Sequence, residues 1–513
     1  MIDSNVQDAL SRRVAGGVAT GLVTQALTAL LGLALVPYII RRLGTDGYAL
    51  LSFSLTLVGY FSFIDLGLTN SVVRFLAEYD GQGNTLAKQK VVATGICIYP
   101  ILGLGAGAIL AALSPFIVTR LLTLPPQLHG IALLVFYITA IGLPITFLKA
   151  YFEAIPMAHQ RVIALNGLNL VLNVAKLLLS VVLLAAGYGL IAVVTGNVIM
   201  TFIHTLVLLW MSIKCLPHDF HFEFRLDFVL LKAMLVNGVL VSATNLSSQL
   251  MVNIDKILIG AFLPINALSY YVVSYELASR LWYIPNQIMR AHFPTFGYLW
   301  GQNNMDLLRY HYRQAVGQVV IGVSFVGIFL VVYSETILRF WVGSSFAESG
   351  SRPLQFLALG LMMSCAGTGP YSLMIAIGRA NATARIRTIV LTTNVLLCLL
   401  LIPRYGIDGA AVAWFISNLV DAILLNWRVD RALFPGTIWW LCRHVLLGAV
   451  FFSSIILSGL YVARNVLQGL LSLSILFAAG YCIYLFVSYH VILTKEEQKL
   501  IRSIWSGLRL SAR

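Results

Sequence analysis

Ionisable side chains stand inside stretches of this sequence that are otherwise apolar enough to lie in lipid. A charge inside hydrocarbon is costly, so it pairs with another charge or faces a water-filled cavity. The cations that we expect to line a cavity and bind an anionic group are Arg74, Lys176, Lys256, Arg280 and Arg290. The acids that could bind a proton or Na⁺ are Asp65, Asp255, Glu276 and Asp421.

Three of the cations indicate what a cavity could bind. Arg74 and Arg290 lie toward the same end of two apolar stretches, and guanidinium groups match phosphate oxygens two at a time. If both arginines face one chamber, they would bind a diphosphate well. Lys176 has no acidic residue within one helical turn and lies too deep to reach the membrane surface, so it needs a partner from another helix or a wet cavity.

Two acid–base pairs have a simpler explanation. Lys149 and Glu153 are spaced i, i+4 near a helix end, where pairing with each other is sufficient. Glu276 and Arg280 share this spacing but lie nearer the middle of their stretch, which favours a cavity-facing role for Arg280.

Two of the apolar stretches should bend next to their charges. Asp65 is followed by Leu66 and Gly67, and Pro285 interrupts the stretch that carries Arg280. Bends within lipid need polar surroundings or a cavity, because the freed backbone groups must find partners.

Residue patterns for other kinds of chemistry are missing from the sequence. It contains no P-loop and no H-E-x-x-H pair, and its six cysteines are not spaced as a metal site or redox pair. We therefore expect no cofactor and no metal site, with H⁺ or Na⁺ as the ions that could drive a cycle. The net charge of +14 includes no basic run, so we expect no nucleic-acid partner.

The composition places these residues in membrane-spanning helices. Of the 513 residues, 59% are hydrophobic and 11% are charged, and the mean hydropathy is +0.87. Apolar segments long enough to cross about 30 Å of hydrocarbon predict an all-α integral membrane protein of about 14 transmembrane helices. Lys and Arg lie about three to one on the side of the N-terminus, which predicts that both termini are cytoplasmic.

The predicted helices fall into five parts. We expect an N-terminal six-helix lobe at 1–213, a cytoplasmic connector at 214–232 and a C-terminal six-helix lobe at 233–427. Two additional transmembrane helices follow within 428–493, near 441–462 and 469–493, and a cytoplasmic amphipathic tail within 494–513 completes the chain.

Two echoes between the lobes indicate a duplication. The loop at 80–84 (Asp-Gly-Gln-Gly-Asn) returns about 220 positions later at 301–304 (Gly-Gln-Asn-Asn), and 187–189 (Gly-Tyr-Gly) returns at 404–406 (Arg-Tyr-Gly). Lobes of six helices enter the membrane from the same side, so a pseudo-two-fold axis along the membrane normal should relate them around a central cavity. Chance recurrence of common loop residues is the alternative.

Three segments in the first two predicted helices carry a resemblance to a known family. Residues 40–48 (Ile-Arg-Arg-Leu-Gly-Thr-Asp-Gly-Tyr), 65–68 (Asp-Leu-Gly-Leu) and 72–79 (Val-Val-Arg-Phe-Leu-Ala-Glu-Tyr) resemble the polysaccharide-repeat-unit flippases. These belong to the multidrug/oligosaccharidyl-lipid/polysaccharide exporter superfamily. The rest of the chain is similar to that family in its pattern of spans, paired lobes and short loops.

The resemblance implies alternating access between two six-helix bundles. The cargo would be an undecaprenyl-diphosphate-linked oligosaccharide, moved from the cytoplasmic to the periplasmic leaflet of a bacterial inner membrane, with membrane lipids, a polysaccharide polymerase and export machinery as partners. Relatives carry cations in the first, second, seventh and eighth helices. Arg74, Lys256, Arg280 and Arg290 stand in the last three of these, whereas the first predicted helix has no charge in its apolar part.

Two other functions remain open. A drug or organic-cation exporter of the same superfamily would be served better by an acidic cavity than by the predicted cations. A membrane-embedded polysaccharide polymerase or ligase would generally need a substantial external loop, and the predicted loops on that side are short.

Overall fold

The computed structural model describes residues 4–65, 67–216 and 227–441, together with the short pieces 443, 453–455, 458 and 477–484. These residues are almost wholly helical, and the one β feature among them is an isolated bridge between Thr123 and Pro264. The chain forms two compact units, Met1–Ser269 and Tyr270–Arg513. The all-α fold predicted from the sequence is confirmed.

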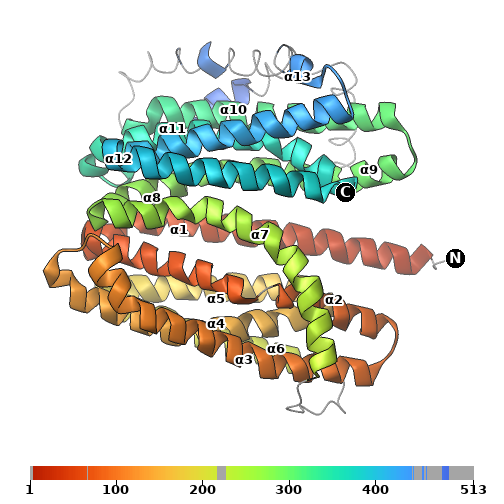
Figure 1. The fold of residues 1–513 in the computed structure, drawn as a ribbon, viewed down its shortest axis with the longest axis horizontal. Coiled ribbons are helices and arrows are strands. Elements are labelled where there is room, and N and C mark those ends of the chain that lie inside the picture. The colour runs from red at the N-terminus through yellow and green to blue at the C-terminus, as the bar shows by residue number, and fades with distance from the viewer. Residues whose placement is uncertain are drawn as a thin grey trace. The chain divides into compact units, whose positions relative to one another are not determined.

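The first unit contains the helices from α1 to α7 and the beginning of α8 (Figure 1). Its elements are α1 (Ser4–Phe61), η1 (Ser62–Asp65), α2 (Leu68–Gly81), α3 (Thr85–Phe116), η2 (Ile117–Leu121), η3 (Pro126–Leu128), α4 (His129–Ala158), α5 (Val162–Ala185), α6 (Leu190–Ile213), α7 (Phe228–Phe262) and the start of α8 (Ile265–Ser279).

The second unit continues from α8. Its further elements are η4 (Arg280–Trp282), α9 (Tyr283–Gly301), α10 (Met305–Trp341), α11 (Ser344–Ala376), α12 (Ala380–Ala432) and the short α13 (Thr437–Trp440). Helix α11 packs against both α10 and α12. Much of its length is buried, including its small residues Gly360 and Gly367.

Two of the longest helices each contain a sharp kink at a glycine. In α1 Gly44 has φ 72° and ψ 173°, and in α12 Gly406 has φ 60° and ψ −139°. Residues with a side chain rarely adopt a positive φ, so glycine is suited to both positions. Each kink divides its long helix into two arms.

The first predicted echo corresponds to one backbone turn that occurs in both units. In the turn after α2, Gly83 N donates to Asp80 O and Asn84 N to Tyr79 O; in the turn after α9, Asn303 N donates to Trp300 O and Asn304 N to Leu299 O. Gly83 and Asn303 are both left-handed, with φ 66° and 57°. Asn84 and Asn304 then cap the following helix, accepting hydrogen bonds from Ala87 N and Leu307 N.

A second shared turn was not predicted from the sequence. After α4, Gln160 N donates to Met157 O and Arg161 N to Pro156 O; after α11, Gly378 N donates to Ile375 O and Arg379 N to Met374 O. The left-handed residues are Gln160 and Gly378. Because these residues differ in type, the repeat is visible in the backbone conformation and not in the sequence.

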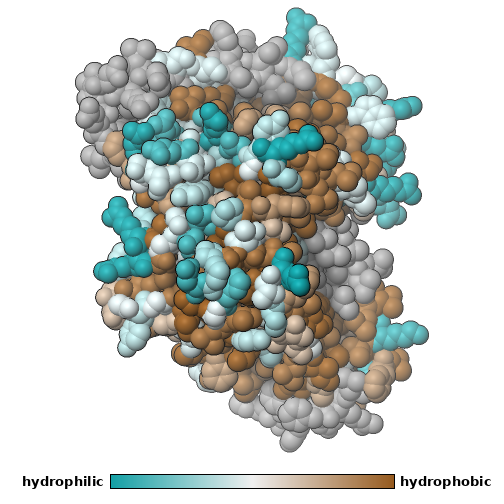
Figure 2. Space-filling view, turned by 60° about the vertical axis from the view of Figure 1, so that its left-hand side comes forward, coloured by the Kyte–Doolittle hydropathy of each residue, from teal (hydrophilic) through white to brown (hydrophobic). Residues whose placement is uncertain are grey.

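The outer surfaces are those of a multi-pass membrane protein. Seven helices among the described residues are long and apolar enough to cross a membrane. Large apolar side chains lie exposed along them, among them Ile141, Val171 and Leu400, and Figure 2 shows broad hydrophobic areas on the visible surface. The full count of about fourteen spans stays a prediction, because most of 441–493 and the whole predicted tail at 494–513 lie outside the described residues.

The lobe boundaries also stay a prediction. Most of the predicted connector, 217–226, lies outside the described residues, and α7 packs against α1, α2 and α3 within Met1–Ser269. One link is a hydrogen bond of 2.8 Å from Ser71 Oγ in α2 to Met234 O in α7. Another is the ion pair of 3.6 Å between Lys90 and Asp227, the residue that caps α7.

Candidate ion and substrate sites

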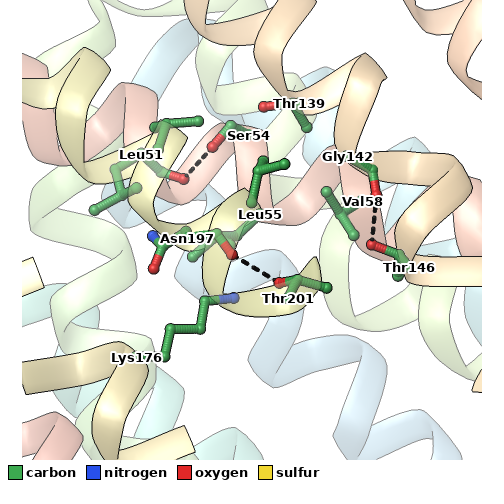
Figure 3. Close-up of a pocket in the computed structure, with 12 residues that line it drawn as sticks. Leu51, Ser54, Leu55, Val58, Thr139, Gly142, Thr146, Lys176, Asn197 and Thr201 are labelled. Carbon is green, nitrogen blue, oxygen red and sulfur yellow. Dashed lines mark hydrogen bonds between the residues drawn. The ribbon is translucent and has the colours of Figure 1, made fainter. Parts of the chain in front are cut away.

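A small polar pocket lies inside the first unit, among α1, α4, α5 and α6. Its volume is about 70 Å³, and the ammonium of Lys176 points into it toward Asn197 and Thr201 (Figure 3). Lys176 therefore lines a pocket inside the first unit, and its part in a cargo-binding cavity stays a prediction. The lining residues are Leu51, Ser54, Leu55, Val58, Thr139, Gly142, Thr146, Lys176, Val194, Asn197, Val198 and Thr201.

The hydroxyl groups of this pocket all donate their protons to the main chain. Ser54 Oγ donates to Leu51 O at 2.7 Å. The three threonines donate to the carbonyl four residues earlier: Thr139 to Val135 at 2.7 Å, Thr146 to Gly142 at 2.9 Å and Thr201 to Asn197 at 2.7 Å. Because a hydroxyl has a single proton, these groups have only lone pairs left to offer a ligand.

A chain of polar side chains links three helices of the same unit. Lys149 lies 3.6 Å from Glu153 on α4, which confirms the predicted i, i+4 pair. Asn169 on α5 donates to Glu153 Oε1 at 2.8 Å, and its Oδ1 lies 2.9 Å from Nε2 of the buried His204 on α6. Sequence reasoning missed Asn169 and His204. Each is a polar residue on an otherwise apolar helix, which could have marked it as a candidate. The sequence does not indicate that the two side chains contact each other.

A larger hollow of about 720 Å³ lies along α5 and α6 and is almost entirely apolar. Its lining includes Leu179, Leu183, Tyr188, Ile191 and Ile199, and no lining side chain is charged. It therefore offers no group that could pair with a phosphate.

Asp65 lies just before α2, and Arg74 lies within that helix. Asp65 closes η1, and its Oδ2 accepts a hydrogen bond of 3.2 Å from Thr69 N in the first turn of α2. Gly67 between them is left-handed, with φ 70°, so the bend predicted at Asp65–Gly67 is confirmed. Arg74 is exposed on α2, with its guanidinium 5.8 Å from the centre of the Phe75 ring.

Asp255 and Lys256 are neighbours on α7 but differ in exposure. Asp255 is completely buried, and its Oδ1 accepts a hydrogen bond of 2.8 Å from Lys256 N. The Lys256 ammonium donates to Asn253 Oδ1 at 2.9 Å.

Glu276 and Arg280 form the ion pair that their spacing allows. The distance from Arg280 Nη2 to Glu276 Oε2 is 2.6 Å, and Nη1 lies 3.2 Å from the hydroxyl of Tyr283. Arg280 opens the 3₁₀ segment η4, so the break falls directly at this charge. The break expected next to this charge is thus present, because a proline disturbs the carbonyl four residues earlier, and for Pro285 that residue is Leu281.

Arg290 and Asp421 differ sharply in their surroundings. Arg290 is exposed on α9, and the described residues give it no ion pair. Asp421 is completely buried on the second arm of α12 and lies 3.5 Å from Arg387 on the first arm. Arg387 also stacks on Tyr371 of α11, at 5.1 Å from the ring centre.

The predicted site residues are thus divided between the two units. Arg74, Lys176 and Lys256 belong to Met1–Ser269, whereas Arg280 and Arg290 belong to Tyr270–Arg513. Among the residues predicted to bind cargo or ions, Glu276 and Arg280 are the one acid–cation pair with an ion pair between described residues. That the five cations share one chamber stays a prediction.

Sequence comparisons relate the chain to polysaccharide and membrane-transport proteins. Residues 14–300 match the family described as polysaccharide biosynthesis protein. A putative O-antigen transporter of Shigella flexneri is 24% identical over 79% of this chain and 95% of that protein. The uncharacterized membrane protein EpsK of Bacillus subtilis is 22% identical over 94% of this chain and 96% of its own length. A probable flippase of Haloferax volcanii, AglR, is 25% identical over 35% of this chain and 38% of its own length.

Solved structures share the fold at low sequence identity. The lipid II flippase MurJ in an inward closed conformation superposes with a TM-score of 0.73, at 16% identity, over 91% of this chain and 98% of that chain. A multidrug resistance MATE family transporter of the MOP superfamily, in an inward-facing conformation, gives a TM-score of 0.65 at 15% identity over 79% of this chain and 94% of that one. The family resemblance that the first two helices indicated is supported by the match of residues 14–300 to the polysaccharide biosynthesis family.

Proposed function

Because the chain belongs to the polysaccharide biosynthesis protein family, we propose that it is a flippase for a lipid-linked oligosaccharide. The cargo we propose is an undecaprenyl-diphosphate-linked repeat unit, carried from the cytoplasmic to the periplasmic leaflet of a bacterial inner membrane. The observation that carries the proposal is that a member of this family holds exposed arginines, Arg74 and Arg290, on helices of a multi-pass membrane fold.

The diphosphate is the part of such a cargo that these arginines suit. A guanidinium can donate two parallel hydrogen bonds to phosphate oxygens, and the interaction strengthens away from bulk water. In each unit the arginine lies before a turn of the same geometry: Arg74 is seven residues before Gly81, and Arg290 is eleven before Gly301. The difference of four residues is about one helical turn, so both arginines lie on the same helix face relative to their turns.

Arg280 would bind the diphosphate by exchanging the carboxylate of Glu276 for a phosphate group. In the structure its guanidinium is held by Glu276, whose side chain is 40% exposed. An entering diphosphate carries more negative charge than one carboxylate and can displace it. Lys256, held by a neutral amide oxygen of Asn253, would change partners at a smaller electrostatic cost.

The acidic residues are the proposed ion-coupling groups. Asp65 has one buried carboxylate oxygen with no hydrogen-bond partner among the described residues, and Asp255 and Asp421 are completely buried. Carboxylates in such places can bind H⁺ or Na⁺ as their surroundings change during alternating access. With Glu276, these three residues are the candidates for coupling.

The proposal is tested by measuring flipping with purified components. The full chain is reconstituted into liposomes that contain a fluorescent undecaprenyl-diphosphate-linked saccharide, and a membrane-impermeant quencher reports the fraction in the outer leaflet. We expect protein-dependent quenching beyond the outer-leaflet fraction that protein-free liposomes show. A fluorescent phosphatidylcholine of matched chain length is the control cargo, and equal movement of both lipids would contradict a diphosphate-specific flippase.

The same liposomes test the exporter alternative, which the fold shared with a multidrug transporter keeps open. Uptake of a cationic dye in an ion gradient, with no movement of the lipid-linked saccharide, would favour the exporter. Chemical extension of the saccharide would instead favour a polymerase or ligase.

A further inference from the structure

The pocket that Lys176 enters offers more hydrogen-bond acceptors than donors. Its four hydroxyl groups present lone pairs, because each donates its proton to a main-chain carbonyl. No lining side chain is acidic, and Lys176 is the one cation among them. The side-chain amide of Asn197 can both donate and accept, and the four hydroxyl oxygens complement a group that only donates.

The pocket is also small, with a volume of about 70 Å³. An ammonium group fits such a space, and a single water can join it to the hydroxyl oxygens.

Lys176 has no competing partner elsewhere in its unit. Among residues 4–65, 67–216 and 227–269, no hydrogen bond or ion pair engages its ammonium, whereas Lys149 on the neighbouring α4 pairs with Glu153. In Figure 3 the ammonium points between Asn197 and Thr201, both on α6. The side chain therefore brings its charge from α5 to a wall formed by α1, α4 and α6.

We propose that Lys176 is a tethered cation: its ammonium enters a pocket of the first unit whose polar lining is four hydroxyl groups and one amide, and which would otherwise accept a small free cation such as Na⁺. This role replaces the expectation that Lys176 contacts the diphosphate, and it does not depend on the proposed cargo. The first unit then carries its own positive charge at this place and needs no ion from solution there. Any ion coupling must then use another site.

The first experiment restores the missing group from solution. Lys176→Ala removes a propylammonium fragment, so the midpoint of thermal unfolding of the full purified chain is measured in choline, sodium and n-propylammonium chlorides at equal ionic strength. We expect the variant to unfold below wild type in choline and to regain about 2 °C or more in n-propylammonium, and to a smaller extent in sodium. Wild type should respond to neither salt, and Lys214→Ala, which removes an exposed lysine at the end of α6, should behave as wild type does.

Three outcomes would overturn the proposal. Equal recovery with n-propanol would show that filling space is enough, and recovery with neither cation would show that the pocket does not select a positive group. The third is a sodium response in wild type, which would show that a free cation binds while Lys176 is present.

A second pair of variants covers the case in which Lys176→Ala cannot be purified. Lys176→Gln keeps two hydrogens that can donate to the same oxygens, whereas Lys176→Met has a similar length and no donor. We expect the Gln variant to unfold at the higher temperature, and the reverse order would contradict a donor role. If instead pyrophosphate stabilises wild type and Lys176→Gln loses that stabilisation, the ammonium is an anion ligand and the proposal is wrong.

Discussion

The carboxylate of Asp421 lies 3.5 Å from the guanidinium of Arg387, across the kink that folds α12 back on itself. Asp421 is completely buried, and the Arg387 side chain is 22% exposed. Opposite charges thus join the two arms of one helix at a place where the carboxylate of Asp421 is out of contact with water. Gly409, just after the kink, leaves no room for a side chain, because a Cβ there would lie 2.3 Å from Leu401 O.

Asp421→Asn should destabilise the second unit, because it leaves the guanidinium of Arg387 without its carboxylate. Breaking one side of a buried pair costs about 3–5 kcal/mol in soluble proteins, so we expect a clear fall in the midpoint of thermal unfolding. The double variant Asp421→Asn/Arg387→Met should recover most of the loss. A stable Asp421→Asn protein that has lost transport would instead favour an ion-coupling role for Asp421.

Arg74→Ala and Arg290→Ala should each reduce flipping of the diphosphate-linked saccharide at least tenfold, about the effect of losing one charge-assisted contact to phosphate. Lysine at either position should keep part of the activity, because it retains the charge but loses the paired donors. Arg120→Ala is the matched control, since Arg120 is also exposed in the first unit but lies in η2. Undiminished flipping in both arginine variants would contradict the proposed diphosphate site.

The turn after α2 should make the folded protein less stable in acid. A hydrogen bond of 2.6 Å from the Lys88 ammonium lowers the pKa of Asp80 below its ordinary value. The pKa of Asp80 is therefore lower in the folded chain than in the unfolded chain. The stabilisation that this carboxylate contributes is fully present above its unfolded pKa and is lost as the pH falls through its folded pKa.

Thermal midpoints measured from pH 6 down to about pH 3 should therefore drop less in Lys88→Met than in wild type. The difference should be small and should shrink in 1 M salt, since the Asp80 side chain is 44% exposed. Identical acid sensitivity in the two proteins would rule out this contribution.

The two copies of the shared turn should tolerate the same exchanges. Gly83→Asn and Asn303→Gly should leave stability nearly unchanged, because both residue types adopt a left-handed backbone. Valine at either position should cost about 1–2 kcal/mol, seen as a lower midpoint of thermal unfolding. Equal effects of Asn and Val at residue 83 would contradict the shared geometry.

Local features of the fold were predictable from the sequence. The bend after Asp65 followed from Gly67, which takes a left-handed conformation, and the pair Lys149–Glu153 followed from its spacing on one helix. The break beside Arg280 followed from Pro285 in the same way. A proline cannot bond the carbonyl four residues earlier, here that of Leu281, and the chain is 3₁₀ at Arg280–Trp282.

Contacts between helices could not be predicted in the same way. The links from Asn169 to His204 and from Arg387 to Asp421 join residues whose spacing along the chain carries no geometric information. Likewise, the sequence showed that Lys176 needed a cavity, but not that the hydroxyl protons around it were already used by the main chain.

The shared three-residue turns bear on how the protein is made. Only residues 82–84 separate α2 from α3, and only 302–304 separate α9 from α10. Both helices of such a hairpin leave the ribosome in immediate succession. Only three residues lie between them, so the translocon handles almost no polar connecting chain. Each pair can therefore pass into lipid as one inserting unit whose backbone polar groups are already satisfied.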